Sequence, residues 1–362
     1  MIQEKCTSSE WITEIARTKK ADKGLVQKLI RALILLEGLS ESNIKFVFKG
    51  GTALMLLLGS TKRLSIDIDI IISEVVENLE EVLSEIATKK GFIRAEEQHR
   101  NANSGIEKAH YKFYFQNSLK ANDEEFVLLD ILFEDIYYNN LVSTQIQSTF
   151  VSHDGEIKET TTPDFNNIMG DKLTAFAPNT TGIPYYKKEK PMGQEIIKQL
   201  YDIGNIFEEI DDVNVVNSVF SSFALVELQY RNMGEDLNLV LDDIIENCIS
   251  ISLRQQVGNA NFEVLQLGLK QITSYIFSES YHIEKATVHA ARTAYLVALM
   301  QTETVIERYS YKIDMTTWQI ELPNNTKLNK LKKTNPEAFY YWFKYFSVKV
   351  KHQIDKTEPP RA

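Results

Sequence analysis

The chain has 362 residues, 43% of them hydrophobic and 25% charged, a composition typical of a soluble globular protein with two or three domains. Its net charge of −10 argues against a protein that coats nucleic acid non-specifically. Cys6 and Cys248 offer neither a disulfide framework nor a metal-ligand spacing, and no signal peptide or membrane-spanning apolar stretch is found, so we expect a cytoplasmic protein without membrane attachment.

The first half of the chain alternates between helical and strand patterns. The expected elements are a helix at 22–38, a strand at 44–48, a helix at 53–58, a strand at 64–72, a helix at 77–90 and strands at 109–116 and 125–133. Thr52 is placed to cap the second of these helices, and Gly59 to end it. This order of strands and helices predicts a small α/β sheet between residues 44 and 135.

Helical patterns dominate from about residue 163 onward. They cover residues 163–177, 193–210, 213–232, 235–257, 260–278, 282–310 and 335–353. We therefore predict an α+β fold in two domains. Residues 1–160 hold N-terminal helices and the sheet, and residues 161–362 form a helical domain.

The segment Lys49-Gly50-Gly51-Thr52 gives the first chemical signal. A glycine pair between a strand and a helix lets the backbone turn sharply, and it leaves N–H groups facing an anion at the helix N-terminus. Taken alone, such a pair is more often only a tight turn.

Three acids favour the phosphate interpretation. Asp67 and Asp69 are two residues apart on an expected strand, so both point to one side, where they repel unless a cation such as Mg²⁺ lies between them. Asp130 interrupts the apolar run 126–133, where a carboxylate should be paired, hydrogen-bonded or metal-bound. The alternatives are a solvated strand face for the first two and a turn cap for Asp130. Together the acids and the glycine turn indicate a two-metal phosphoryl-transfer site.

These residues resemble a known family. Lys49–Leu54 and Arg63–Ile70 are similar to the opening signature of the AbiEii/AbiGii nucleotidyltransferase-like toxins, with Leu64 in place of the usual aromatic residue and Ile66 in place of a frequent acid. The resemblance implies a polymerase-β-type nucleotidyltransferase core, a small mixed sheet with helices. A large helical C-terminal region follows and contributes to the nucleotide site.

Two segments in the second half extend the resemblance, which covers residues 45–207 or so. Asp171–Ala175 is similar to a family helix whose lysine faces the triphosphate, although without the resemblance Lys172 would be taken for a solvated helix lysine. Lys198–Ile203 is similar to a second family segment, with Gln199 where an acid is usual.

The resemblance implies a site for a nucleoside triphosphate and Mg²⁺, with two ions during turnover. It assigns metal binding and catalysis to Asp67, Asp69 and Asp130, and Asp130 also accepts the proton of the attacking hydroxyl. Arg63 either clamps phosphate or forms a salt bridge with the acids. The nucleotide-binding residues are Lys49, Gly50, Gly51, Thr52, Arg63, Ser65, Lys172, Lys198 and Asp202.

The histidines and the C-terminal tail carry weaker signals. No metal-ligand spacing is found among His99, His110, His153, His282, His289 and His352. The tail 327–361 has nine basic and three acidic residues, hence a charge of +6. Its aromatic segment Phe339–Phe346 either stacks on nucleic-acid bases or packs on the helical body, and docking is the more common outcome.

We therefore predict transfer of a nucleoside monophosphate from an NTP to an acceptor hydroxyl. The resemblance implies the toxin of a type IV toxin–antitoxin or abortive-infection system, with a cognate antitoxin encoded nearby and tRNA as a candidate acceptor. The alternatives are a small-molecule or protein acceptor, and an NTP-binding module without turnover, for which Gln199 is the hint. The sequence leaves the nucleotide, the acceptor and the oligomeric state open.

Overall fold

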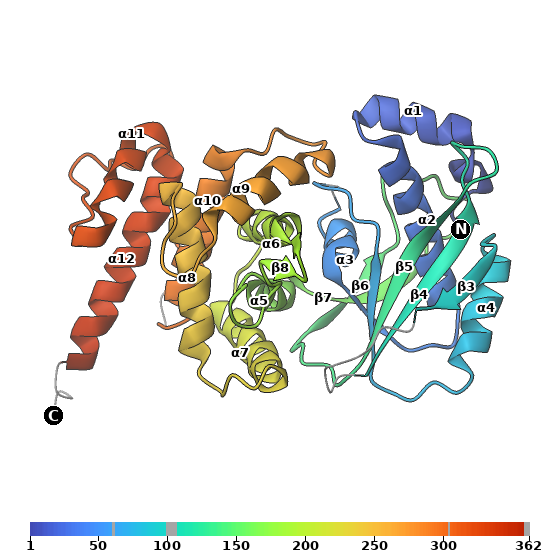
Figure 1. Ribbon diagram of the computed structural model, residues 1–362, viewed down its shortest axis with the longest axis horizontal. Coiled ribbons are helices and arrows are strands. Elements are labelled where there is room, and N and C mark those ends of the chain that lie inside the picture. Colours follow the sequence, from blue (N-terminus) through green and yellow to red (C-terminus); the bar gives the residue numbers. More distant parts are fainter. Residues whose placement is uncertain (60–61, 99–106, 303–304, 358–362) are drawn as a thin grey trace. The chain divides into compact units, whose positions relative to one another are not determined.

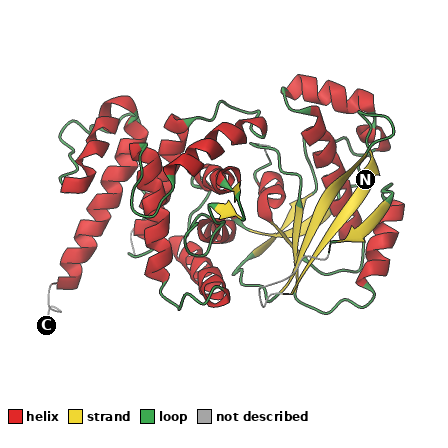
Figure 2. Ribbon diagram, in the orientation of Figure 1, coloured by secondary structure: helices red, strands yellow, loops and turns green. Residues whose placement is uncertain are grey.

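The computed structural model describes residues 1–59, 62–98, 107–302 and 305–357. It divides the chain into two compact units: unit 1 is Met1–Asp164 with Thr273–Ser280, and unit 2 is Phe165–Ile272 with Tyr281–Ala362. Figures 1 and 2 show a mixed sheet with helices in unit 1 and mainly helices in unit 2. The predicted α+β fold, a small mixed sheet followed by a helical region, is confirmed. The expected division placed the boundary after residue 160. In the structure, unit 1 runs to Asp164 and also includes the later segment Thr273–Ser280.

Unit 1 is built on a five-stranded mixed sheet of order β1-β2-β5-β4-β3. Its strands are β1 (Val47–Lys49), β2 (Ile68–Ile72), β3 (Arg94–Glu97), β4 (Glu107–Gln116) and β5 (Glu124–Phe133). β2 and β5 are parallel, and the other pairs are antiparallel. The edge strand β3 was not predicted, because its sequence Arg-Ala-Glu-Glu lacks the apolar alternation of a half-buried strand.

The helices of unit 1 are α1 (Ser9–Lys19), α2 (Lys23–Ser40), α3 (Gly50–Leu57) and α4 (Leu79–Lys89). Asp22 caps α2 by accepting a hydrogen bond from the backbone N–H of Leu25. The apolar residues of α2 share one core with one face of the sheet. A two-stranded antiparallel sheet completes the unit, formed by β6 (Leu141–Gln145) and β7 (Glu159–Pro163).

Two local predictions in unit 1 are wrong. The strand expected at 64–72 begins only at Ile68, because Leu64 donates its N–H to the carbonyl of Tyr275 and not to a sheet neighbour. Thr52 does not cap α3. The N-cap residue is Lys49, and the Thr52 hydroxyl instead donates to the carbonyl of Asp67 at 2.7 Å.

Each helix predicted in the second half has a counterpart in unit 2, although the one expected at 260–278 ends at Gln271 and the one expected at 282–310 ends at Leu299. The helices are α5 (Phe165–Ala175), α6 (Gly193–Ile206), α7 (Val213–Tyr230), α8 (Leu237–Leu253), α9 (Phe262–Gln271), α10 (Ile283–Leu299), the short α11 (Leu331–Thr334) and α12 (Pro336–Thr357). A short hairpin of β8 (Tyr186–Lys187) and β9 (Lys190–Pro191) precedes α6. None of the described helices is long and apolar enough to cross a membrane.

The aromatic segment of α12 packs into the core of unit 2, as the docking alternative predicted. Phe339, Tyr341 and Trp342 are fully buried, and α12 packs against α10. The Trp342 indole N–H donates to Ser252 Oγ of α8 at 3.0 Å. The last residues of the basic tail, 358–362, lie outside the described ranges.

Candidate active site

Strand pairing in unit 1 brings four polar residues into one row across the sheet. Lys49 pairs with Asp69 between β1 and β2, and Asp69 pairs with Asp130 between β2 and β5. Asp130 pairs in turn with His110 between β5 and β4. Side chains of directly paired residues lie on the same face of a sheet, so the four form one polar row.

The neighbouring row has the opposite character. Its side chains point to the other face and are buried in the core shared with α2; they belong to Phe48, Ile70, Ile131 and Ala109. The polar row is half-buried. The sheet therefore has an apolar core face and a second face on which two carboxylates are neighbours.

The glycine turn lies against this row. Gly50 has φ +81°, and a Cβ placed on it would lie 2.1 Å from Asp69 Oδ2. A Cβ on Gly51 would lie 2.5 Å from Arg63 Nη2 and 2.6 Å from Ser65 Oγ. At Gly50 the positive φ and the close carboxylate both favour glycine, whereas at Gly51 a side chain would displace the ends of Arg63 and Ser65. The two segments of the sequence motif, Lys49–Leu54 and Arg63–Ile70, thus meet at the start of α3.

Asp67 is placed differently from Asp69. It precedes β2, whose first residue is Ile68, so the strand geometry that predicted two carboxylates on one side does not extend to it. The hydrogen bond from Thr52 to its carbonyl ties Asp67 to the first turn of α3. Thr52 therefore fixes the loop that leads into β2.

Asp130 has a partner that the sequence analysis missed. His110 Nδ1 and Asp130 Oδ1 are 2.6 Å apart, with the two side chains 17% and 31% exposed. Asp130 is hydrogen-bonded within a strand, so the turn-cap alternative is wrong. The sequence held only part of this signal. Counting outward from the turn of the expected 109–116 and 125–133 hairpin places His110 opposite Ile131, whereas the observed pairing begins at Gln116 and Glu124 and so places His110 opposite Asp130.

Arg63 is buried, at 7% exposed, in the loop between α3 and β2. Its Nη1 donates to the carbonyl of Leu64, and its Nη2 side faces Gly51. The loop is held by Thr273–Ser280. Ser278 Oγ donates to the carbonyl of Lys62 at 2.6 Å, and the N–H of Leu64 donates to the carbonyl of Tyr275 at 2.8 Å.

Three of the predicted site residues belong to unit 2. Lys172 of α5 donates from Nζ to Asp202 Oδ2 at 2.8 Å and to Gln199 Oε1 at 3.1 Å, both on α6. The Lys172 and Asp202 side chains are 8% and 4% exposed, so the solvated-lysine alternative is wrong. Lys198 lies on the same helix α6. That these residues share a site with the polar row of unit 1 remains a prediction.

The donor set for a metal can be compared with what Mg²⁺ requires. Within the described ranges, no group of three or more His, Cys, Asp or Glu side chains is placed to hold a metal ion. Magnesium is commonly bound through one or two carboxylates together with substrate phosphates and water. Asp69 and Asp130, on adjacent strands, fit that smaller requirement, whereas a part for Asp67 stays a prediction.

Two other histidines, His282 and His289, have contacts that belong to the packing of α10. His289 is buried in α10, its ring lies against Gly204, and burial lowers its pKa to about 3, so it stays neutral. His282 precedes α10 and pairs with Glu284. His99 lies outside the described residues.

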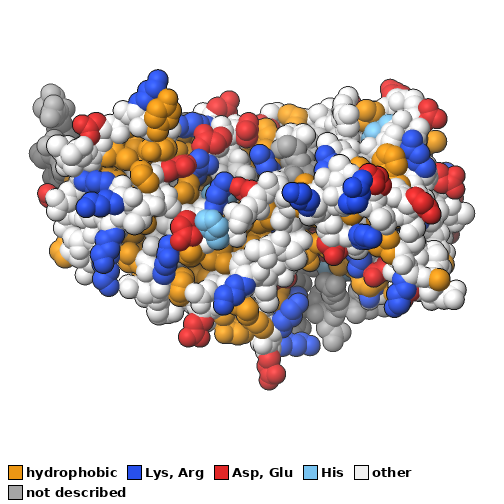
Figure 3. All heavy atoms as spheres, turned by 90° about the horizontal axis from the view of Figure 1, so that it is seen from above, with side chains coloured by type: hydrophobic (Ala, Val, Ile, Leu, Met, Phe, Trp, Pro, Cys, Tyr) orange, Lys and Arg blue, Asp and Glu red, His pale blue; other side chains and the backbone are white. Residues whose placement is uncertain are grey.

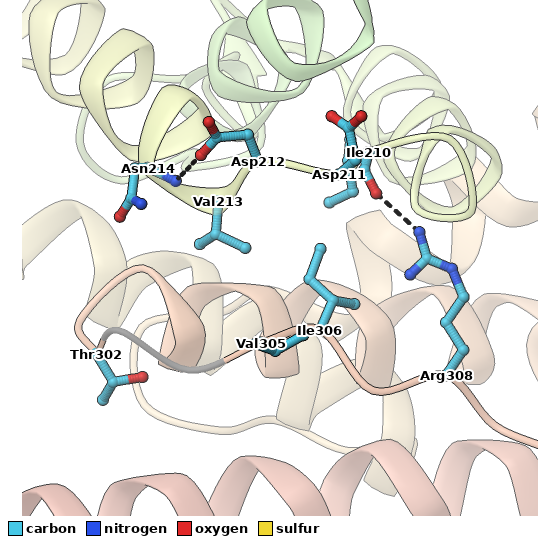
Figure 4. A pocket seen from close by; sticks show the side chains of 9 residues that line it. All are labelled: Ile210, Asp211, Asp212, Val213, Asn214, Thr302, Val305, Ile306 and Arg308. Atoms are coloured by element: carbon cyan, nitrogen blue, oxygen red, sulfur yellow. Dashed lines mark hydrogen bonds between the residues drawn. The ribbon is translucent and has the colours of Figure 1, made fainter.

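A cavity of about 460 Å³ in unit 2 contains none of the predicted site residues (Figure 4). Asp212 accepts a hydrogen bond from the N–H of Asn214, and Arg308 donates to the carbonyl of Ile210 at 2.8 Å. These bonds cap α7 and hold the 305–308 segment. Asp212 and Arg308 therefore have structural roles in this cavity.

Charge is mixed over the face in Figure 3, where Lys and Arg side chains are interspersed with Asp and Glu. In the β8–β9 hairpin, Lys187, Lys188 and Lys190 are exposed. Basic side chains thus occur locally on a protein whose net charge is −10.

Comparison with known proteins identifies the class. The family model described as "Nucleotidyl transferase AbiEii toxin, Type IV TA system" matches residues 34–257, more than half of the chain. The protein is therefore a nucleotidyltransferase. It belongs to the AbiEii toxin family of type IV toxin–antitoxin systems, as the motifs predicted.

Several solved structures are similar at low sequence identity, whereas no curated protein matches. JHP933 from Helicobacter pylori is 13% identical with a TM-score of 0.43, over 78% of this chain and 96% of that chain. A putative nucleotidyltransferase from H. pylori gives the same identity and TM-score, over 78% and 97%. MenT4, nucleotidyltransferase toxin Rv2826c from Mycobacterium tuberculosis H37Rv, is 13% identical with a TM-score of 0.43, over 91% and 98%.

Proposed function

We propose that this protein transfers a nucleoside monophosphate from an NTP to an acceptor hydroxyl in a Mg²⁺-dependent reaction. The observation that carries the proposal is the contact between the glycine turn and the polar row: Gly50 lies against Asp69, and Asp69 is the register neighbour of Asp130. A phosphate-binding helix N-terminus beside paired carboxylates suits phosphoryl transfer.

In this proposal the backbone N–H groups at the start of α3 hold the β- and γ-phosphates, and Arg63 and Ser65 line the same turn. Asp69 and Asp130, with Asp67, would hold Mg²⁺. When bound, the ion stabilises negative charge on the phosphates and orients their oxygens.

The acceptor oxygen forms a bond to the α-phosphorus as the bond from that phosphorus to the bridging oxygen of the β-phosphate breaks, so pyrophosphate leaves. The proton of the acceptor hydroxyl passes to Asp130. The family resemblance also implies nucleotide-binding roles for Lys172, Lys198 and Asp202.

Membership of the AbiEii family supports a proposal about the biological setting. We propose that the protein acts in the cytoplasm as the toxin of a pair whose antitoxin is encoded nearby, with tRNA as the acceptor. The exposed lysines of the β8–β9 hairpin support a polyanionic acceptor, because they offer cations to a phosphate backbone.

The test is transfer from each of four α-³²P-labelled NTPs to total bacterial RNA and protein, with Mg²⁺ or with EDTA. We expect a labelled tRNA-sized band and released pyrophosphate with Mg²⁺ only. Asp69→Asn and Asp130→Asn should each lower transfer by at least ~100-fold, as expected when a group that acts in the transition state is removed. Asp123→Asn is the matched control, because Asp123 lies in the β4–β5 turn and pairs with Lys120.

Two results would contradict parts of this proposal. Label on protein or on a small molecule, with RNA unlabelled, would overturn the tRNA acceptor. The second result is NTP binding in calorimetry without pyrophosphate release, for every NTP and with both RNA and protein present. It would show that the protein binds NTP without catalysing transfer.

A further inference from the structure

The hydrogen bond between His110 and Asp130 is not explained by the fold alone. Asp130 is 31% exposed on the polar face of the sheet, so water can solvate its carboxylate without help from a side chain. It is nevertheless joined to a ring on the neighbouring strand at 2.6 Å. Hydrogen bonds to an ionised carboxylate are short and strong, so this bond fixes the rotation of the Asp130 carboxylate.

The two neighbouring carboxylates have different surroundings. The Asp69 carboxylate lies where a side chain at position 50 would be, because a Cβ on Gly50 would be 2.1 Å from Asp69 Oδ2. The Asp130 carboxylate is hydrogen-bonded through Oδ1 to His110 on the neighbouring strand.

We propose that His110 is a positioning residue for nucleotidyl transfer. Its Nδ1–H donates to Asp130 Oδ1, which holds the carboxylate in one rotamer and leaves Oδ2 as the oxygen that serves the reaction. Donation from Nδ1 also fixes the tautomer of the ring, with the lone pair of a neutral imidazole on Nε2. This inference rests on the proposed function, because it assigns His110 to the same site.

The substitutions that test it separate the donor from the ring. In His110→Asn the side-chain amide can donate from nearly the position of Nδ1, whereas His110→Leu removes the donor. Lys112→Leu is the matched control, because Lys112 lies two residues along the same strand and face, where its ammonium is over Phe126 at 4.4 Å.

We expect His110→Leu to lower kcat by ~10–100-fold and to raise the Mg²⁺ concentration for half-maximal rate by a similar factor, the usual effect of losing a group that orients a ligating side chain. The KM for NTP should change little. His110→Asn should recover most of the lost kcat, and Lys112→Leu should match the unaltered protein. In an Asp130→Asn background, His110→Leu should cause almost no further loss, because the two residues act as one unit.

A second measurement does not depend on activity. In the metal-free protein, ¹H–¹⁵N NMR of the histidine side chains should show a downfield Nδ1–H proton for His110 that disappears in Asp130→Ala. An unprotonated Nδ1 in the unaltered protein would overturn the proposal. So would an active enzyme in which His110→Leu has unchanged kcat and Mg²⁺ dependence, or one in which His110→Asn is as impaired as His110→Leu.

The two proposals fail in different ways. If the unaltered protein releases no pyrophosphate with any NTP, the proposed function fails, and His110 then has no reaction to serve. If the unaltered protein is active and only the His110 comparisons fail, the proposed function stands and this inference alone is wrong.

Discussion

Gly50 combines two constraints that usually occur apart. Its φ of +81° lies in the left-handed region, where a side chain is strained, and a Cβ at this position would lie 2.1 Å from Asp69 Oδ2. Gly59, at the end of α3, has a similar φ of +60° but, among the described atoms, no neighbour within 4 Å of a Cβ. The two glycines therefore separate backbone strain from displacement of the carboxylate.

We predict that Gly59→Ala lowers the free energy of unfolding by about 1 kcal/mol, from backbone strain, and leaves nucleotidyl transfer near its original rate. Gly50→Ala should show the same strain and in addition lower kcat by at least ~10-fold, because the new methyl group moves Asp69 away from Asp130. Urea unfolding and pyrophosphate release measure the two effects. Equal kcat in both variants would show that the position of Asp69 does not matter.

At the scale of residues, the sequence could indicate what is local along the chain. Residue type and spacing singled out the glycine turn, Asp69 and Asp130, which the structure places next to one another, and their roles in catalysis stay a prediction. His110 was missed, since its role depends on a cross-strand partner. The burial of Lys172 was missed for the same reason, because its partners lie on another helix.

At the scale of elements, α5 and α6 are joined by a buried ion pair. Lys172 and Asp202 are nearly inaccessible, and the ammonium also donates to Gln199. Removing one member of such a pair lowers the free energy of unfolding, because the remaining charge stays buried without its partner.

We predict that Lys172→Met lowers the free energy of unfolding by about 3–5 kcal/mol, the range for removal of one member of a buried pair. The double variant Lys172→Met/Asp202→Leu should be more stable than the single variant, since it removes both charges. Lys333→Met on α11 is the control, because Lys333 is exposed. Urea unfolding that shows Lys172→Met to be as stable as this control would contradict the buried-pair argument.

Helices were predicted better than strands and termini. Long apolar periodicity identified each long helix of unit 2, but α10 ends at Leu299, well before the predicted residue 310. The start of β2 was missed because Leu64 bonds to the distant Tyr275, which no local pattern reveals. Tertiary contacts, not intrinsic preference, decided these ends.

At the scale of the whole molecule, each unit has its own buried core. In unit 1 the sheet and α2 share apolar residues, and in unit 2 the aromatic residues of α12 pack with α8 and α10. Separate cores allow each unit to open with its own free energy.

We predict that Trp342→Ala destabilises unit 2 by about 3–5 kcal/mol, as expected for loss of a fully buried aromatic side chain. In hydrogen–deuterium exchange, peptides from α8, α10 and α12 should lose protection while those from β4 and β5 keep theirs. Ile70→Ala should give the converse pattern. Uniform loss of protection in either variant would mean that the units unfold as one.

The division into a mixed first half and a helical second half was visible in the sequence, but the return of the chain to unit 1 was not. Residues 260–278 were predicted as one helix, whereas α9 ends at Gln271 and Thr273–Ser280 joins the other unit. The contacts that place this segment, such as the 5.5 Å ring contact of Phe277 with Phe150, are remote in sequence.

This return has a consequence for the order of events during translation. The loop that carries Arg63 is made early, yet the Tyr275 and Ser278 groups that hold it emerge from the ribosome more than two hundred residues later. During synthesis, the loop beside the glycine turn therefore lacks these two hydrogen bonds until the later segment has been made. A protein fragment limited to the matched residues 34–257 would lack Tyr275 and Ser278, so the loop would never gain these two hydrogen bonds.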